Sequence, residues 1–384
     1  RINIVDTPGH ADFGGEVERI LSMVDSVLLL VDAVEGPMPQ TRFVTRKAFE
    51  NGLNPIVMVN KIDRDGARPD WVIDEVFELF DQLGATDEQL DFPVIFGSAL
   101  EGKAGMSAND IEDNMSCLLQ AIIDRVPAPD VDISGPLQMQ ISTLDYSSYV
   151  GVIGLGRIAR GTVKTGSPVV VVNKSGAERK ARILQVMGYN GLQRVEVDSA
   201  SAGDIICISG VDELQISDTI CAPGHVAPFP PLEVDEPTIS MTFQVNTSPF
   251  AGRDGKFVTS RNIKERLERE LLHNVALRVE ATDSADKFKV SGRGELHLGV
   301  LIENMRREGY ELGVSRPEVI FKEVDGQYQE PLEIVLLDIE GTHQGSVMKE
   351  LGERKANLIN MTPDSTGRVR LEFLIPTRGL IGFR

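Results

Sequence analysis

The sequence predicts a multidomain protein of α/β and β class: a truncated doubly wound sheet, an antiparallel β-barrel, a ferredoxin-like α+β domain and a second, partial ferredoxin-like domain. Three observations predict this order. Continuous apolar runs alternate with helical patterns in the first third, glycine-punctuated Val and Ile runs fill the next part, and a strand, helix, strand, strand order begins twice in the last part. The 384 residues, 41% hydrophobic and 25% charged, suffice for several buried cores.

The doubly wound sheet is expected in residues 1–128. Its strands are predicted from short, continuous apolar runs, which are typical of strands buried on both faces: 1–5, 26–31, 54–59 and 92–96. Its helices are predicted at 40–52, 70–83 and 110–126, where apolar residues recur at helical spacing. A strand and helix alternation of this kind favours a parallel sheet with helices on both faces.

The remaining domains are predicted at 134–230 for the barrel, 235–317 for the ferredoxin-like domain and 328–384 for its partial repeat. In the repeat, strand 332–339, helix 346–355 and strands 357–361 and 368–375 are expected before the chain stops. A half sheet with an open edge is an unusual end for a domain, and the first apolar run begins at residue 1. We therefore expect a chain truncated at both ends.

The charge is strongly acidic but unevenly distributed. The net charge is -19, and residues 1–130 hold 10 Lys and Arg against 24 Asp and Glu. Residues 253–322 instead hold 14 basic against 12 acidic residues, so a local cationic face is possible there although the whole molecule is an anion.

Composition also bears on the compartment. The cysteines, Cys117, Cys207 and Cys221, show no zinc or disulfide spacing and are expected to be free thiols in a reducing compartment. The longest apolar run, 27–31, is far shorter than the roughly 20 residues that a membrane span needs. We expect a cytoplasmic protein without a membrane partner.

Polar residues follow two of the predicted buried strands. Asn60, Lys61 and Asp63 follow one strand, and Ser98 and Ala99 follow another. Asp63 could accept both the N1–H and the 2-amino group of a guanine base, and the Ala99 N–H could meet the guanine O6. Asn60 would brace the neighbouring loops, and the Lys61 stem would cover the base. These loops are therefore predicted to select guanine.

A turn at Asp6–His10 is predicted to face the phosphates of the same nucleotide. Asp6 would hold Mg²⁺ through its water shell, the Gly9 N–H would meet the γ-phosphate, and His10 would orient the attacking water. Each motif alone is weak, because such short patterns recur by chance. Their order along the chain makes the combined hypothesis stronger than the alternative of plain turns.

These motifs lead to a family resemblance. The segments DTPGHADFGGEVER, NKID and GSAL resemble the GTP-binding domain of translational GTPases, a group that includes elongation factor G and LepA. The segments TSPFAGRDGKFVTSRNIKERLERELLHNVALRVE, VSGRGELHLGVLIENMRREGYELGVSRPEVI and IPTRGLIGFR look like the BipA, or TypA, family. The chain departs from the group at Ala11, where Val is usual, and at 36–41, where the group usually has a Gly-Val-Glu-Ala-Gln-Thr type run.

The resemblance implies a ribosome-dependent GTPase that hydrolyses GTP to GDP and phosphate, in translation or ribosome assembly. It implies GTP/GDP and Mg²⁺ as ligands and the ribosome and ribosomal RNA as partners, without DNA, and a monomer is expected. It also implies that the phosphate-binding loop precedes Arg1 and that a BipA-specific domain follows Arg384, so this chain alone is expected to be inactive.

Two alternatives remain open at this stage. In the first, the chain is a nucleotide-independent ribosomal RNA-binding module, with Arg253, Lys256 and Arg261 contacting RNA rather than belonging to a solvated helix with i,i+4 ion pairs. In the second, Gly97–Ala104 is the phosphate loop of a metabolic kinase, because it fits G-x-x-x-x-G-K. That motif has Ala104 where a Mg²⁺-binding hydroxyl is required, which argues against it.

Overall fold

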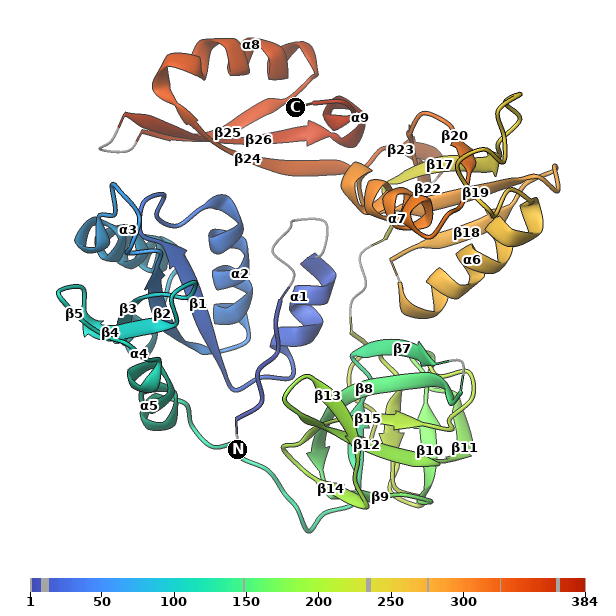
Figure 1. Cartoon of the computed structure of the whole chain (residues 1–384), viewed down its shortest axis with the longest axis horizontal. Coiled ribbons are helices and arrows are strands. Elements are labelled where there is room, and N and C mark those ends of the chain that lie inside the picture. Colours follow the sequence, from blue (N-terminus) through green and yellow to red (C-terminus); the bar gives the residue numbers. More distant parts are fainter. Residues whose placement is uncertain are drawn as a thin grey trace. The chain divides into compact units, whose positions relative to one another are not determined.

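The structure is a computed structural model that describes residues 2–7, 14–147, 149–232, 236–274, 276–324, 326–363 and 367–383 (Figure 1). The chain divides into two compact units. The first comprises Arg1–Ser142, Gly156–Cys207 and Thr219–Phe229, and the second comprises Thr143–Leu155, Ile208–Asp218 and Pro230–Arg384.

The first unit contains a five-stranded sheet in the order β1-β2-β3-β4-β5. The strands β1 (Ser26–Asp32), β2 (Asn54–Asn60) and β3 (Val94–Ser98) are parallel, and β4 (Lys103–Ser107) and β5 (Asp110–Glu112) extend the sheet antiparallel. The three parallel strands lie where the apolar runs predicted them.

Helices cover both faces of this sheet. The helices are α1 (Gly14–Leu21), α2 (Pro39–Glu50), α3 (Pro69–Gln82), α4 (Asp87–Leu90) and α5 (Ser116–Arg125). Val57 and Val59 of β2 share one buried cluster with residues of α3, including Phe80. The alternate residues Ile56 and Met58 share another with residues of α5. Successive side chains of a strand point to opposite faces, so the helices lie on two sides, as predicted.

Burial on both faces holds for β2 but not for β1. Leu29 and Val31 of β1 are buried, whereas Leu28 is 40% exposed and Leu30 is 54% exposed. The strand lies at the edge of the sheet, and α5 packs against β2, β3 and β4 rather than β1. The prediction of a strand buried on both faces was therefore wrong for this element.

Two other predictions in this domain were wrong. Residues 2–7 form no strand, and Ile4 is 84% exposed, because no described strand pairs with this segment and an isolated strand satisfies few of its backbone groups. The helix predicted at 110–126 begins only at Ser116. Residues 110–112 instead pair with β4 as β5, and the Asn114 side chain accepts the Ser116 N–H at 2.7 Å, which starts the helix there.

The next domain is an antiparallel β fold, as predicted. Its strands are β6 (Gln138–Gln140), β7 (Thr143–Ser147), β8 (Gly151–Arg160), β9 (Thr162–Lys164), β10 (Pro168–Val172), β11 (Glu178–Arg182), β12 (Gln185–Asn190), β13 (Gln193–Glu196), β14 (Ser199–Ser201), β15 (Ile205–Ser209) and β16 (Thr219–Cys221). Eight of them follow the order β11-β10-β16-β6-β8-β15-β12-β13. Fully buried isoleucines form much of the core: 141, 158, 183, 206, 208 and 220.

From residue 239 onwards the second unit has a β-α-β-β-α-β order followed by a short strand. The elements are β17 (Ile239–Val245), α6 (Ser260–His273), β18 (Arg278–Ala281), β19 (Lys287–Gly292), α7 (Glu295–Arg307), β20 (Leu312–Val314) and β21 (Glu318–Val319). The sheet order is β18-β19-β17-β20. Phe243 and Val290 of the sheet pack with Leu267 of α6 and Leu298 of α7 in one buried cluster.

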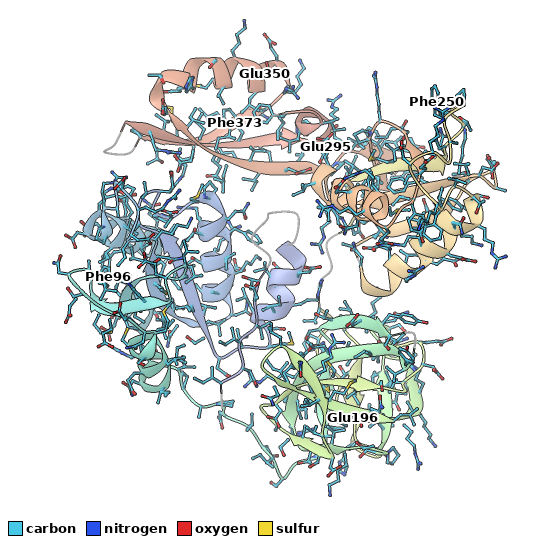
Figure 2. All side chains as sticks on the ribbon, viewed as in Figure 1. Phe96, Glu196, Phe250, Glu295, Glu350 and Phe373 are labelled. Atoms are coloured by element: carbon cyan, nitrogen blue, oxygen red, sulfur yellow. The ribbon has the colours of Figure 1, made fainter. Side chains whose placement is uncertain are left out.

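The last part repeats a shorter version of that order. A hairpin of β22 (Lys322–Val324) and β23 (Gln327–Gln329) precedes β24 (Leu332–Glu340), a 3-10 turn at Gly341–His343, α8 (Gln344–Glu353), β25 (Asn357–Pro363), β26 (Arg368–Pro376) and α9 (Thr377–Leu380). The sheet order is β24-β26-β25. Figure 2 shows Phe373 of β26 in this sheet, where it packs with Leu351 of α8 and Leu371.

A partly buried ion pair joins the two helices α6 and α7. The Arg266 side chain is only 9% exposed, and its guanidinium donates two hydrogen bonds to Glu308, at 2.7 and 2.8 Å, and one to Glu270, at 2.8 Å. Hydrogen bonding to Arg266 lowers the pKa of Glu308, which caps the end of α7. A bidentate pair of this kind fixes the angle between two elements as well as stabilising them.

We expect Arg266→Met to lower the free energy of opening of α6 by about 2 kcal/mol, because the variant loses three hydrogen bonds between charged groups. Such bonds contribute about 1.5 to 3 kcal/mol each when buried, and the sum is smaller here because the Glu308 side chain is 41% exposed. Native-state hydrogen exchange of the α6 amides measures this local value. Lys264→Met is the matched control on the same helix, since Lys264 pairs with Glu268 at 3.7 Å and both side chains are more than half exposed. The control should change the value by less than about 0.5 kcal/mol, and equal effects of both variants would contradict the prediction.

Candidate functional site

The Asn60 side chain joins the ends of two parallel strands. Asn60 pairs with Gly97 across β2 and β3, so the loops after both strands leave the sheet at the same edge. Its Oδ1 accepts the backbone N–H of Lys61 at 2.9 Å and that of Ala99 at 2.9 Å. The Asn60 side chain therefore links the two loops by hydrogen bonds, as its predicted bracing role requires.

Asp32, at the end of β1, brings the neighbouring strand into the same cluster. The Lys61 ammonium donates to its Oδ2 at 2.8 Å, and the Arg64 guanidinium lies 3.6 Å from the same oxygen. The other oxygen accepts the N–H of Val34 at 2.8 Å and that of Glu35 at 3.3 Å. Asp32 thus holds both a cation and the loop that follows its own strand.

Backbone conformation contributes to this arrangement. Lys61 has φ of 65°, in the left-handed region that residues with a side chain seldom adopt. The Asn60 and Asp32 side chains hold its amide and its ammonium respectively. These contacts offset the local strain and fix the direction of the loop that carries Asp63.

The electrostatics of Asp32 follow from its partners. Burial alone would raise the pKa of Asp32, but the hydrogen bonds from Lys61, Val34 and Glu35 outweigh it and hold that pKa below its usual value. The ionised carboxylate therefore stabilises the folded state at neutral pH, and this contribution is lost only as the pH falls through the lowered pKa.

Asp32 is a residue of this cluster that the sequence did not predict. In the sequence it stands at the end of an apolar run, and a carboxylate close after a buried strand is the same signal that points to Asp63. Asp32 lies opposite Asn60 in the parallel pairing of β1 and β2. Aligning the ends of the two predicted strands would therefore have placed Asp32 beside Asn60.

The other residues of the predicted guanine loops are only partly arranged for that role. Asp63 is exposed, and within the described ranges its carboxylate has no hydrogen bond or ion pair, so it can accept from a ligand. Ser98 is 3% exposed, and its hydroxyl accepts the Glu101 N–H at 3.3 Å, which shapes the turn. The Ala99 N–H already donates to Asn60, so a guanine O6 would have to share or replace that bond.

The predicted phosphate side is described only at Asp6. Gly9 and His10 lie outside the described residues, so their predicted roles stay predictions. Asp6 is exposed, and none of the described residues forms a hydrogen bond or ion pair with its carboxylate. A carboxylate in this state suits Mg²⁺, which keeps several waters and takes one or two carboxylates besides phosphate oxygens.

The alternative phosphate loop at Gly97–Ala104 is not supported by the fold. These residues run through the end of β3 into the antiparallel strand β4, with Ser98 opposite Lys103. The Lys103 ammonium pairs with Glu101 and with Asp113, both at 3.2 Å. A phosphate loop passes from a strand into a helix, whose N-terminus helps to hold the phosphates, so this hairpin lacks the required form.

The three cations predicted to contact RNA differ from one another. Arg261 pairs with Glu265 at 2.8 Å, one turn along α6. The Arg253 guanidinium lies over the Phe250 ring, 4.6 Å from its centroid. In the part of the chain that the structure describes, neither Arg253 nor Lys256 forms an ion pair.

The described residues show neither a metal-binding cluster nor a membrane-spanning helix. They contain no group of three or more His, Cys, Asp or Glu side chains placed to hold a metal ion. Among the helices they form, none is both long and apolar enough to cross a membrane.

Family comparisons agree with the domain order. Residues 1–128 match the elongation factor Tu GTP-binding domain, residues 151–221 match elongation factor Tu domain 2, and residues 327–384 match the elongation factor G C-terminus. The second match is to a β-barrel domain and falls within the antiparallel strands described above.

Whole-chain comparisons are also close. The chain is 66% identical over 384 residues to the large ribosomal subunit assembly factor BipA of Escherichia coli strain K12, and covers 63% of that protein. It is 65% identical over its full length to the protein of the same name in Haemophilus influenzae, covering 62% of it, and 59% identical to that of Buchnera aphidicola, covering 63%. The chain thus spans less than two thirds of the length of these relatives.

We expect Asp32→Asn to reduce the hydrogen-exchange protection of the Val34 and Glu35 amides by about tenfold at pH 7, since a hydrogen bond to a charged group contributes about 1.5 to 3 kcal/mol and this one is partly exposed. In the unsubstituted chain the same protection should decline only in acid, as Asp32 becomes protonated. Exchange resolved by mass spectrometry at pH 7 and in acid measures both. Asp63→Asn, at an exposed carboxylate in the neighbouring loop, is the control, and a similar loss there would contradict the assignment.

Proposed function

The chain belongs to the BipA family of translational GTPases, and from that premise we propose that it binds guanine nucleotide at the edge formed by β1, β2 and β3. We propose further that the protein hydrolyses GTP to GDP and phosphate on the ribosome, in assembly of the large subunit, as the name of its relatives indicates for them. The observation that supports this most is the Asn60 bridge between the two loops, which leaves the Asp63 carboxylate exposed and without a partner in the described chain.

Guanine selection follows from hydrogen-bonding chemistry. Asp63 would accept from the N1–H and the 2-amino group of guanine, and adenine cannot supply that pair of donors. Hydrogen bonds to a charged group are worth about 1.5 to 3 kcal/mol each, so their loss is enough to exclude the wrong base. Lys61, held by Asp32 at its ammonium, would lay its alkyl stem along the base. The Ser98 hydroxyl, which accepts the Glu101 N–H, would stabilise the turn that contains Ala99.

At the phosphate end, Asp6 would hold Mg²⁺ through water, the Gly9 N–H would meet the γ-phosphate, and His10 would orient the attacking water. When bound, Mg²⁺ supplies positive charge that neutralises the phosphate oxygens. The role given to His10 suits an imidazole, which can both donate and accept a hydrogen bond.

The other assignments extend this proposal. We infer from the element order that the two α+β folds from residue 239 onwards are ferredoxin-like, the second of them partial. The domain bounds would then be 1–128, 134–230, 235–317 and 328–384. The protein would act in the cytoplasm as a monomer, with the ribosome and its RNA as partners. Taken alone, this chain would be inactive in GTP hydrolysis, because no loop in the described residues offers a phosphate-binding lysine at the start of a helix.

A second candidate function is a ribosomal RNA-binding module that needs no nucleotide. The observation that favours it is that Arg253 and Lys256 have no acidic partner among the described residues. Titration of this chain with fluorescent GDP separates the two functions. Weak binding that GTP displaces and ATP does not would support the guanine site, whereas co-sedimentation with ribosomes without any nucleotide binding would support the module.

We expect Asp63→Asn to weaken GDP binding by at least tenfold and to improve binding of xanthosine diphosphate, whose 2-oxo group needs a donor rather than an acceptor. Competition against fluorescent GDP measures both affinities. Asp65→Asn is the matched control, because Asp65 is an exposed carboxylate in the same loop. Unchanged guanine preference in Asp63→Asn would refute the pairing.

We expect His10→Ala to retain GTP affinity and to lose most of the ribosome-stimulated hydrolysis, typically 10²- to 10⁴-fold for a group that assists proton transfer. The test uses the whole protein that carries this chain, with phosphate release measured with and without ribosomes. An equal loss of GTP affinity would instead make His10 a structural turn residue.

A further inference from the structure

The loop between β17 and α6 is folded around one carboxylate. We call residues 246–258 the Glu311 loop. The Glu311 Oε1 accepts the N–H groups of Asp254, at 2.7 Å, and Gly255, at 2.6 Å. Its Oε2 accepts the Gly252 N–H at 2.7 Å and the Asn246 side-chain amide at 3.2 Å. Four donors from one loop therefore converge on a single side chain.

These contacts keep Glu311 ionised. The backbone hydrogen bonds from Gly252, Gly255 and Asp254 lower the pKa of Glu311 to about 2. A carboxylate with a lowered pKa stabilises the fold above its ordinary pKa, and the contribution is lost only as the pH falls towards 2. The loop is therefore fully held at neutral pH.

The base of the loop is held separately. The N–H groups of Lys256 and Phe257 both donate to the Gly309 carbonyl, at 2.8 and 3.1 Å, and the Phe257 and Tyr310 rings lie 4.7 Å apart. Gly255 has no room for a side chain, because a Cβ there would lie 2.7 Å from the Gly309 oxygen and from the Glu311 side chain. The loop is thus preorganised rather than free to sample many conformations.

The outer surface of this loop carries an aromatic ring and two cations. Phe250 is 61% exposed, and Figure 2 shows it on the loop that projects beyond the sheet of this domain. Arg253 lies over one face of that ring, and Arg253 and Lys256 are both exposed. Three of the four cations of the adjacent helix differ, since Arg261, Lys264 and Arg266 each pair with a glutamate.

We propose that the Glu311 loop is a preformed contact for single-stranded or looped RNA. Arg253 and Lys256 would bind backbone phosphates, and the open face of Phe250 would stack on an unpaired base. Cations beside an exposed aromatic ring are the combination that single-stranded nucleic acid binds, because every base has a face to stack and every linkage carries a charge. The identification of this RNA as ribosomal rests on the function proposed above, whereas the chemistry of the contact does not.

A membrane surface fits this loop less well, because interfacial binding needs a broader apolar face than one phenylalanine. An acidic protein would satisfy the cations but would leave the flat, exposed face of Phe250 without a matched partner. RNA uses both features.

The loop offers a test that separates preorganisation from simple charge. Asp254→Asn and Glu311→Gln remove the same negative charge within one loop, but only Glu311 organises the loop, while the exposed Asp254 side chain has no partner among the described residues. If charge alone decides binding, both variants should bind RNA more tightly. If the arrangement decides it, Asp254→Asn should bind more tightly and Glu311→Gln more weakly.

The experiment measures the affinity of this chain for a fluorescein-labelled 12-nucleotide single-stranded RNA of mixed sequence, by anisotropy over a range of salt concentrations. We expect Phe250→Ala to weaken binding about tenfold without changing its salt dependence. Arg253→Ala and Lys256→Ala should each reduce the slope of log affinity against log salt by about 0.7. Lys264→Ala, at a paired cation on α6, is the control and should change the affinity less than either.

Tighter RNA binding by Glu311→Gln, or unchanged RNA binding by Phe250→Ala, would overturn the proposal. It would also be overturned if these variants lost affinity for purified large ribosomal subunits but kept their affinity for the RNA oligomer, because that result would indicate a contact with a ribosomal protein. Hydrogen exchange of α6 and α7 shows whether each variant keeps its fold. Phe250→Ala and Arg253→Ala alter exposed side chains and stay informative even if Glu311→Gln unfolds the loop. Fluorescent GDP titration of the same variants tests the nucleotide site separately. The RNA proposal and the nucleotide proposal can therefore be refuted independently of each other.

Discussion

Parallel pairing of β1, β2 and β3 is the constraint on which the candidate site depends. The register places Asp32 opposite Asn60 and Asn60 opposite Gly97, so three loops that are far apart in the sequence begin at one edge of the sheet. Apolar side chains on both faces of β2 fix that register, since a slip by one residue would exchange its two buried faces. The hydrogen bonds of Asn60 and Asp32 can form only after this alignment. The chemistry of the edge is therefore a consequence of core packing in the sheet below it.

The sequence was informative where a pattern has one structural solution. Continuous apolar runs identified the three parallel strands, and helical spacing identified α3 almost to its ends. It failed where the outcome depends on a partner: residues 2–7 have the composition of a strand but nothing described pairs with them, and residues 110–112 joined β4 rather than the helix. The same distinction holds for the sites. Asn60 belongs to a recognisable motif, whereas Glu311 binds backbone N–H groups, which leave no pattern of side chains to read.

Net charge is a poor guide to the cationic surface of this protein. Many basic residues of the second unit are used in ion pairs, such as Arg306 and Arg307, which both donate to Glu303 and lower its pKa to about 2. Such pairs contribute little field at a distance because the two charges cancel. The cations that matter most for an anionic partner are those outside such ion pairs, as Arg253 and Lys256 are among the described residues, although the whole chain carries a net charge of -19.

Asp32 and Glu311 are acidic residues that each fix the shape of a loop. Each carboxylate gathers backbone N–H groups from a loop, two at Asp32 and three at Glu311. The loop gains a fixed shape without a hydrophobic core of its own, because charge-assisted hydrogen bonds replace the packing that short loops cannot provide. Asp32 also binds Lys61, so its charge is neutralised locally, whereas in the structure described Glu311 has backbone and amide donors only. The negative charge of Glu311 weakens the field of Arg253 and Lys256 and repels RNA phosphates. The proposed contact therefore requires that fixing the two cations in place adds more binding free energy than this repulsion removes.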